Sequence, residues 1–330
     1  MAPWPLPGSF YQQRYLSLAR LGKGTFTTLY TCLDLRTGGY VAVKSENLVE
    51  ARSTQGVVLE KEAAVLRGLS GTGVAPELIQ ADLHALRSRT AKFSSGADGR
   101  RFLPVAAADA CYCTLQILRC VEAMHGRGLI HRDVKPSNVV RTGRGEGDRE
   151  FKIIDFGLSK FFVGEAGDEV DAGRPFESTG GGAEVFLRRE KKGNVGFRGT
   201  TMYASVRAHE EKDACRADDV ASALYTFVDL VVGDLPWRAF STGEGKDKAT
   251  VLQLKQECAG SASHFLLNTP LHSNVGFSDA LQAMFDYVGG LGYYDDVDYD
   301  KVRAGLGRCK AALEGEPYEG AVKLRWGNLE

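Results

Sequence analysis

The residues best suited to chemistry follow two short apolar runs in the middle of the chain. Residues 129–140 read LIHRDVKPSNVV, and residues 151–157 read FKIIDFG. Asp133 and Asn138 stand five positions apart on a stretch whose proline opposes a helix. Asp155 comes where a buried strand would end. A carboxylate that can act as a base, with an amide and a second carboxylate beside it, suits proton abstraction next to a divalent cation.

Together the two motifs resemble the catalytic loop and the metal-binding Asp-Phe-Gly motif of protein kinases. The resemblance implies that Asp133 accepts the proton of a substrate hydroxyl and that Lys135 steadies the transferred group. It also implies that Asn138 and Asp155 hold Mg²⁺ on the phosphates of ATP. A His-Arg-Asp tripeptide alone is weak evidence, whereas the two motifs in this order and spacing are specific.

The elements that must position these residues begin with glycine-broken strands. Three runs that alternate apolar and polar residues predict β-hairpins over residues 15–21, 27–33 and 40–43. Gly22 and Gly24 match the kinase glycine-rich loop, whose backbone N–H groups approach phosphate oxygens, and Thr27 replaces its third glycine. Alone, such a loop is more often an ordinary hairpin turn. The strand with Lys44 that follows it favours the phosphate-binding interpretation.

Lys44 stands one strand later, in the run VAVK, where kinases keep the lysine that grips the α- and β-phosphates. Residues 58–69 predict a helix from apolar residues spaced i, i+4, i+7. Glu62 shares a face with Val58 and Leu66, whereas Glu60 points roughly 160° away. We therefore predict that Glu62 pairs with Lys44. A solvated charge is the alternative for Glu62, and it would be favoured only if Lys44 were absent.

Two further segments surround the motifs. Residues 107–125 predict a helix with one apolar stripe, packed under the catalytic loop; the stripe contains Cys113, Ile117, Val121 and Met124. Residues 161–194 are rich in Gly, Glu and Asp and predict a long loop, which by position is the activation segment. Its basic run, residues 188–192, is either a solvated surface or a dock for an acidic or phosphorylated substrate.

Residues 196–205, GFRGTTMYAS, narrow the resemblance to one kinase family. Most protein kinases have Ala-Pro-Glu here, whereas Tyr-Ala-Ser with His209 after it resembles the casein kinase I family, and GFRGT resembles its tau-tubulin kinase branch. The likeness runs from Tyr15 to about Trp326, with further matches at Asp218, Asp219, Leu235–Trp237, Asp298 and Tyr299. It implies that Asp219, on a helix expected over residues 218–231, hydrogen-bonds the catalytic-loop backbone. A helix N-cap is its other interpretation, and both are compatible.

The likeness also fails at one informative position. The family usually has an arginine where Met202 stands, and that arginine helps to bind an anion beside the substrate. Met202 therefore disfavours recognition of pre-phosphorylated substrates. By position in the family pattern, Leu29 and Ala42 cover one face of the adenine and Val140 covers the other.

The expected fold is a bilobal α+β kinase. Residues 1–14 form a tail, 15–80 a small β-rich lobe, 81–326 a helical lobe with the activation segment at 158–205, and 327–330 a second tail. The expected reaction is transfer of the ATP γ-phosphoryl group to a Ser or Thr hydroxyl of a protein, because Lys135 resembles the lysine of kinases that act on Ser and Thr. Two alternatives are a catalytically weak pseudokinase scaffold, opposed by the intact motifs, and a small-molecule phosphotransferase, disfavoured by the peptide-platform-like Tyr203–Ser205.

Composition predicts the surroundings of the protein. The 330 residues contain 41 Lys plus Arg and 42 Asp plus Glu, so the net charge of -1 favours neither nucleic acid nor an anionic membrane as main partner. The first eight residues hold three prolines and do not resemble a secretion signal. Seven cysteines, with Cys111 and Cys113 too close for a zinc knuckle, predict reduced thiols in the cytoplasm or nucleus. Oligomeric state is left undetermined.

The nucleotide site is predicted to be incomplete. Between the helix of Glu62 and a helix expected from Ala81, a kinase normally has two further strands and a hinge that hydrogen-bonds adenine. Here only residues 73–79 intervene. Residues 94–101 are polar, and the proline in residues 101–106 suits an inner strand poorly.

We therefore expect ATP to bind weakly or not at all, and we expect low stability from the apolar surface that missing strands would expose. Calorimetric titration of the purified protein with ATP and Mg²⁺ measures the affinity. A dissociation constant in the micromolar range would contradict this expectation.

Overall fold

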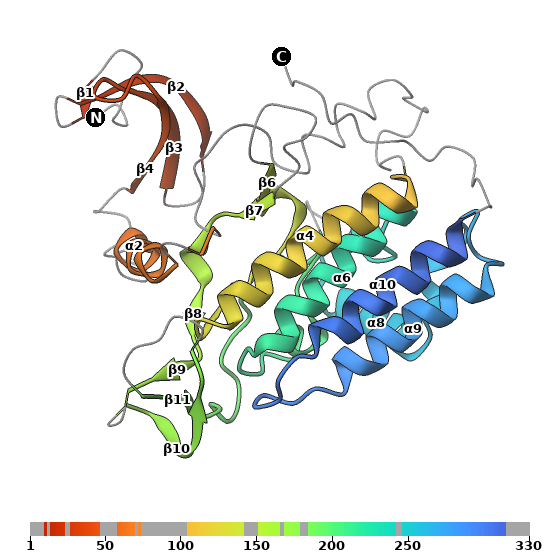
Figure 1. Cartoon of the computed structure of the whole chain (residues 1–330). Helices are drawn as coiled ribbons and strands as arrows, with labels where there is room; N and C mark the ends of the chain where they lie inside the picture. Colours follow the sequence, from red (N-terminus) through yellow and green to blue (C-terminus); the bar gives the residue numbers. More distant parts are fainter. Residues whose placement is uncertain are drawn as a thin grey trace.

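The computed structural model describes residues 10–11, 14–23, 27–46, 58–69, 72–73, 104–141, 151–165, 168–178, 184–241 and 246–314. These residues form a small sheet with one helix beside it and a larger group of packed helices (Figure 1). Strands β6 (Val139–Arg141), β7 (Phe151–Ile153) and β8 (Lys160–Phe161) lie between the two parts and adjoin the catalytic motifs. This is the bilobal α+β arrangement that the sequence predicted.

The small lobe is built from an antiparallel sheet in the order β1-β2-β3-β4. Its strands are β1 (Phe10–Tyr11), β2 (Tyr15–Lys23), β3 (Thr27–Asp34) and β4 (Tyr40–Glu46), and the last three confirm the predicted runs. Arg14 clamps the end of β3, because its Nε and Nη2 donate to the two carboxylate oxygens of Asp34 at 2.8 and 2.6 Å. Helix α2 (Val58–Gly68) matches the predicted helix and packs against β4.

Strand register decides which side chains share a face of this sheet. Leu29 pairs with Lys44 and Thr31 pairs with Ala42, while Gly22 pairs with Leu29 across the other hairpin. Directly paired residues project to the same face, and side chains alternate along each strand. Gly22, Leu29, Ala42 and Lys44 therefore lie on one face. Gly24 lies outside the described residues, so its predicted contact stays a prediction.

The large lobe is formed mainly by α4 (Ala107–His125), α6 (Arg216–Val232), α8 (Lys248–Gly260), α9 (Val275–Gly289) and α10 (Tyr299–Leu313). Helix α4 has its predicted bounds and packs against α6 and α10. Its stripe of Cys113, Ile117, Val121 and Met124 is fully buried. The segments α5 (Val206–His209), α7 (Arg238–Ser241) and η3 (Ala262–Leu266) complete the lobe. Among the described helices, none has the length and apolar character to span a bilayer.

Helix α6 begins two residues earlier than predicted, at Arg216. Cys215 is its N-cap residue, and the carboxylate of Asp218 accepts the Cys215 backbone N–H at 2.7 Å. The backbone N–H of the N-cap residue is therefore bonded from within the first turn of the helix. Asp219 is not the N-cap, and its carboxylate is free for another task.

The activation segment is not a simple loop, which corrects the prediction for residues 161–194. It contains a three-stranded antiparallel sheet in the order β10-β11-β9, formed by β9 (Val163–Gly164), β10 (Val170–Phe176) and β11 (Val185–Arg188). The high Gly, Asp and Glu content masked the strand signal of the β-branched and aromatic residues. One of the aromatic residues, Phe176, packs edge to face on Phe162, with ring centres 5.3 Å apart. The sheet projects from the helical body (Figure 1).

The helix predicted from Ala81, the polar residues 94–101 and the missing hinge lie outside the described residues, as does the lobe boundary near residue 80. These stay predictions. The described chain resumes at Pro104, and Val105 donates its backbone N–H to Leu230 O at 2.7 Å, which ties the start of α4 to the end of α6.

Candidate active site

The two catalytic motifs lie on one hairpin. Strand β5 (Leu129–Ile130) leads into the catalytic loop, the short helix η1 (Pro136–Asn138) ends it, and β6 (Val139–Arg141) then pairs with β7 (Phe151–Ile153). The chain turns after β7 through Asp155 into η2 (Phe156–Leu158). Because β6 and β7 are hydrogen-bonded neighbours, the loop before one strand and the motif after the other stand side by side. Val140, predicted to cover one face of the adenine, is buried on β6.

Asp133 is almost buried and fully hydrogen-bonded. Its Oδ2 accepts from Lys135 Nζ at 2.6 Å, and its Oδ1 accepts from Thr200 Oγ1 at 2.7 Å. Lys135 Nζ also donates to Thr200 Oγ1 at 2.8 Å. The predicted base therefore faces an aliphatic hydroxyl with an ammonium group beside it. Thr200 was missed as a site residue, because it stands 67 positions from Asp133 and nothing local links them.

Asn138 supports the same loop and keeps an oxygen available. Its Nδ2 donates to the backbone oxygen of Asp133 at 3.0 Å and to Oδ2 of the same residue at 3.3 Å. The amide NH₂ is thereby used, and the Oδ1 atom is left as the group that can face a cation. Asp155 is in the left-handed region, with φ 68°, and its side chain is 47% exposed. Both predicted metal ligands thus present an oxygen on the hairpin.

Lys44 connects the small lobe to this hairpin. Its Nζ lies 2.9 Å from Glu62 Oε2 and 2.8 Å from Asp155 Oδ1. The predicted Lys44–Glu62 ion pair is confirmed, and the contact with Asp155 is an addition. Burial lowers the pKa of Lys44, but the charges of Asp155 and Glu62 outweigh it and raise that pKa. For Asp155 burial acts in the opposite direction and raises the pKa, but the charge of Lys44 outweighs it and holds the pKa of Asp155 below its usual value.

Asp219 holds the catalytic loop from below. Its Oδ2 accepts the backbone N–H of His131 at 2.6 Å, and its Oδ1 accepts that of Arg132 at 2.8 Å. The implied role of Asp219 is therefore confirmed. Burial raises the pKa of Asp219, but the hydrogen bond and charge of His125, at 3.0 Å, outweigh it and hold the pKa below its usual value. Tyr299 in turn contacts the other ring nitrogen of His125.

His131 links the two motifs and was missed by the sequence analysis. Its Nδ1 accepts the Asp133 backbone N–H at 3.2 Å, so its Nε2 donates to Ile154 O at 3.1 Å. The ring packs edge to face on Phe156 at 5.3 Å. The motif shows a histidine two positions before Asp133, but only the fold shows that this histidine is fully buried and which two groups it contacts.

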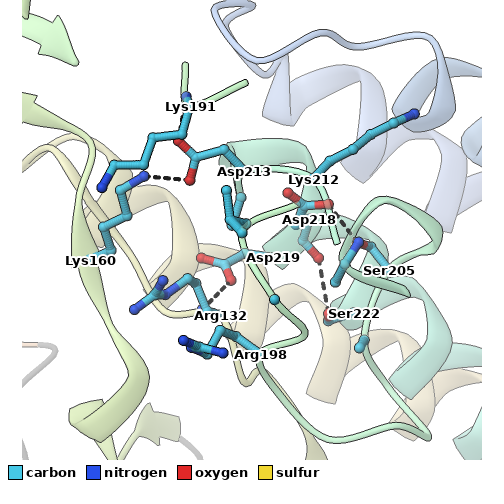
Figure 2. A pocket seen from close by; sticks show the side chains of 15 residues that line it. Arg132, Lys160, Lys191, Arg198, Ser205, Lys212, Asp213, Asp218, Asp219 and Ser222 are labelled. Atoms are coloured by element: carbon cyan, nitrogen blue, oxygen red, sulfur yellow. Dashed lines mark hydrogen bonds and ion pairs between the residues drawn. The ribbon is translucent and has the colours of Figure 1, made fainter. Parts of the chain in front are cut away.

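A basic cavity of about 210 Å³ lies beside the catalytic loop (Figure 2). Five cationic residues line it, namely Arg132, Lys160, Lys191, Arg198 and Lys212. Asp213 neutralises Lys160 at 2.6 Å, whereas Arg132, Lys191 and Arg198 form no ion pair within the described part of the chain.

The residues of the basic run 188–192 have different environments. Arg188 and Arg189 donate to the backbone oxygens of Val163 and Val170 at 2.9 Å, so they hold the activation-segment sheet. Lys192 is 89% exposed, as the solvated-surface interpretation requires. Only Lys191 of this run lines the cavity.

Comparison with known proteins shows the family of this chain. Residues 15–282 match the protein kinase domain family. The chain belongs to the protein kinase family. A probable serine/threonine-protein kinase of Dictyostelium discoideum is 27% identical over 342 positions, which cover 97% of this kinase and 59% of that protein.

Two further relatives bear casein kinase I names. A putative casein kinase I of Caenorhabditis elegans is 27% identical over 242 positions, covering 70% of this kinase and 64% of the relative. A probable casein kinase I homologue of Encephalitozoon cuniculi is 29% identical over 183 positions, covering 56% and 50%. The kinase spans half to two thirds of the length of these three relatives. The likeness to casein kinase I is modest, and no tau-tubulin kinase is among these three.

The candidate oxygen ligands of this kinase, Asn138 and Asp155, fit a cation that is held jointly with phosphate. The described residues contain no cluster of three or more His, Cys, Asp or Glu side chains that could hold a metal alone. Mg²⁺ commonly takes only one or two protein oxygens and completes its shell with phosphates and water. Asn138 and Asp155 are such a pair of hard oxygen donors, and Lys44 beside Asp155 suits the phosphates.

Replacement of Asp219 by asparagine tests the support of the catalytic loop. An amide cannot accept from all three donors, so we expect Asp219→Asn to lower the free energy of unfolding by about 2 to 3 kcal/mol at pH 7 and to reduce kcat. Because the folded pKa of Asp219 is depressed, its contribution is fully present above the unfolded value of about 3.9, starts to decrease below that value and is lost as the pH falls through the folded pKa. Denaturant unfolding at pH 7 and pH 3.5 should show the difference between parent and variant shrinking at the lower pH.

Asp279→Asn is the control, because Asp279 is exposed on α9. It should match the parent at both pH values. An Asp219→Asn protein as stable as the parent at pH 7 would contradict the assignment.

Proposed function

We propose that this chain is a protein serine/threonine kinase that transfers the γ-phosphoryl group of ATP to a Ser or Thr hydroxyl of a protein substrate, with Mg²⁺ as the cation. The observation that carries the proposal is the position of Lys44 Nζ, within 2.9 Å of both Glu62 and Asp155. This contact gathers the candidate phosphate-binding lysine, its supporting helix and a candidate metal ligand in one place. The names of the relatives support the class of reaction.

In this mechanism Asp133 orients the substrate hydroxyl and accepts its proton. Lys135 Nζ, 2.6 Å from Asp133, is placed to stabilise negative charge on the transferred group. Lys44 binds the α- and β-phosphates, Gly22 lets the backbone approach them, and Asn138 and Asp155 supply oxygens to the cation. Mg²⁺, when bound, neutralises phosphate charge. Transfer is then mainly a matter of positioning and electrostatics, which these preset contacts serve.

The contact between Asp133 and Thr200 supports a Ser or Thr acceptor. A small aliphatic hydroxyl already lies 2.7 Å from Asp133 Oδ1, with Lys135 at 2.8 Å from the same hydroxyl. A substrate hydroxyl must approach the same carboxylate. The scaffold alternative gains no support from the comparisons, and the intact set of Lys44, Asp133, Asn138 and Asp155 opposes it. The Tyr203–Ser205 segment still disfavours a small-molecule substrate.

The finer proposal is a casein kinase I-like enzyme. Ser205 replaces the usual acidic end of the activation segment, and its Oγ caps α5 through Ala208 N at 2.9 Å and donates to Asp218 at 2.5 Å. The tau-tubulin kinase branch is proposed from residues 196–200 alone. Met202 is buried and apolar, so it offers no charge for a priming phosphate. A cytoplasmic or nuclear location is proposed from the seven cysteines, which are buried as thiols and not joined in disulfides.

The decisive experiment incubates the purified protein with labelled ATP, Mg²⁺ and a peptide library that contains neutral, acidic and pre-phosphorylated Ser, Thr and Tyr peptides. Transfer to Ser or Thr supports the proposal, and the preferred peptides define substrate class. The basic cavity favours acidic peptides. Millimolar ATP allows for a weakened nucleotide site. A protein that phosphorylates none of the peptides would contradict the proposal.

Substitution of the base tests the central role. We expect Asp133→Asn to lower the transfer rate by roughly 10²- to 10⁴-fold, because the amide cannot take the proton, while the variant binds ATP as well as the parent does. The measurements are initial rates and a nucleotide titration on the same preparation. Parental rates in the variant would show that another residue acts as the base.

Substitution of Lys44 separates positioning from stability. The ion pair is partly solvated, so we expect Lys44→Met to change the free energy of unfolding by only about 0 to 1 kcal/mol while lowering the transfer rate far more. Denaturant unfolding and steady-state kinetics give the two quantities. Arg36→Met, on the exposed turn before β4, is the matched control and should change neither. Unchanged kinetics in Lys44→Met would refute the role.

A further inference from the structure

Lys255 is a fully buried lysine that no step above uses. It lies on α8, and its side chain has 0% exposure. Its Nζ donates to Thr201 O at 3.0 Å and also to Ala204 O. The same atom lies 4.8 Å from the ring centre of Tyr225 and 5.0 Å from that of Trp237. Among the described residues it forms no ion pair with a carboxylate.

Burying a lysine side chain costs desolvation free energy. Lysine is almost never fully buried without a charged partner, and burial lowers the pKa of Lys255 well below its usual value. An apolar side chain of similar length would fill the same volume without that desolvation cost. The useful property of Lys255 is therefore its N–H donors. Either protonation state keeps at least two of them, enough for both carbonyls.

The carbonyls that Lys255 serves belong to the segment that contacts the catalytic base. Residues 200–205 lie between elements, so their backbone oxygens need donors from elsewhere. Lys255 bonds the oxygens of Thr201 and Ala204, on either side of the residue pair 202–203. Trp237 Nε1 donates to the intervening Met202 O at 2.7 Å.

Two further side chains complete this support. His209 Nε2 lies 3.1 Å from Thr201 O, and Tyr203 Oη donates to Asp229 at 2.9 Å. These contacts fix the segment from the side of the helical lobe. Its first residue, Thr200, faces Asp133 on the opposite side. A shift of the 201–204 backbone would therefore move the hydroxyl partner of the base.

We propose that Lys255 is a positioning residue for the protein substrate, holding residues 201–204 so that Thr200 stays against Asp133 and the adjoining surface keeps the shape that receives the substrate chain. The proposal rests on the kinase activity proposed above. Lys255 touches neither the nucleotide-binding residues nor Asp133, so its effect should fall on the peptide and not on ATP.

Replacement by methionine is the sharpest test, because it keeps the length of the side chain and removes its donors. We expect Lys255→Met to lower kcat/KM for a peptide by about 10- to 100-fold, as loss of hydrogen bonds from an amine implies, while KM for ATP stays within about twofold. We also expect its thermal midpoint to change little, because removing a desolvated buried amine offsets the cost of the two carbonyl oxygens that lose this donor. A residue with only a structural role would not lower peptide turnover while stability holds or rises.

Two comparison variants complete the experiment. Lys255→Arg retains donors for both carbonyls and should recover at least part of the peptide kcat/KM relative to methionine. Leu313→Ala, a buried substitution at the end of α10, should lower the thermal midpoint without changing KM for the peptide. If Lys255→Met fails to fold, Lys255→Arg with parental peptide kinetics still supports the proposal. Where both variants fold, an arginine variant with a peptide kcat/KM no higher than that of Lys255→Met would overturn the proposal. Where only the arginine variant folds, a reduction of 10-fold or more would overturn it.

The outcomes separate this inference from the proposed function. A parent protein that transfers phosphate to no peptide overturns both. An active parent with parental peptide kinetics in Lys255→Met overturns only the role of Lys255. Equal losses in the peptide and ATP constants, with a lowered thermal midpoint, also overturn it, because they show a general loss of structure.

Discussion

A buried carboxylate on the central helix of the large lobe sets the shape of the catalytic loop. Asp219 accepts two successive backbone N–H groups, those of His131 and Arg132, and Arg132 is in the left-handed region with φ 67°. Non-glycine residues adopt that conformation at a cost of roughly 1 to 2 kcal/mol, so strong acceptors must compensate. Helix α6 supplies the acceptor because it is buried along nearly all of its length and packed on α4. The direction of Asp133 follows from this anchor.

The second constraint crosses between the lobes. Lys44 reaches Glu62 within the small lobe and Asp155 on the hairpin below it, and the two carboxylates raise its pKa despite burial. A lysine between two carboxylates suits later contact with phosphate, because Asp155 can turn to a cation while Lys44 remains charged. Helix α2 packs against η2, so the position of Glu62 and the turn at Asp155 are coupled. The site therefore depends on both lobes.

Sequence patterns anticipated most of the local structure around the site. The bounds of α4, the three strands of the small lobe and the strand before Asp155 all follow from periodicity and turn residues. The activation-segment sheet did not, because its glycine and acidic content masks a strand signal that depends on pairing across the sheet. The start of α6 was also placed late, since Asp218 bonds the backbone of Cys215 from inside the helix.

The sequence by itself determined the residue types and their local spacing: Asp133 and Asn138 five positions apart on a loop, Asp155 directly after a strand, and Lys44 within one. Those features depend on neighbours along the chain. The tertiary structure alone decided that Thr200 contacts Asp133 and that a lysine on α8 holds the segment after Thr200. The reason is physical: such pairs, 67 and 54 positions apart, are joined by packing of whole helices, and no local periodicity encodes which buried donor meets which carbonyl.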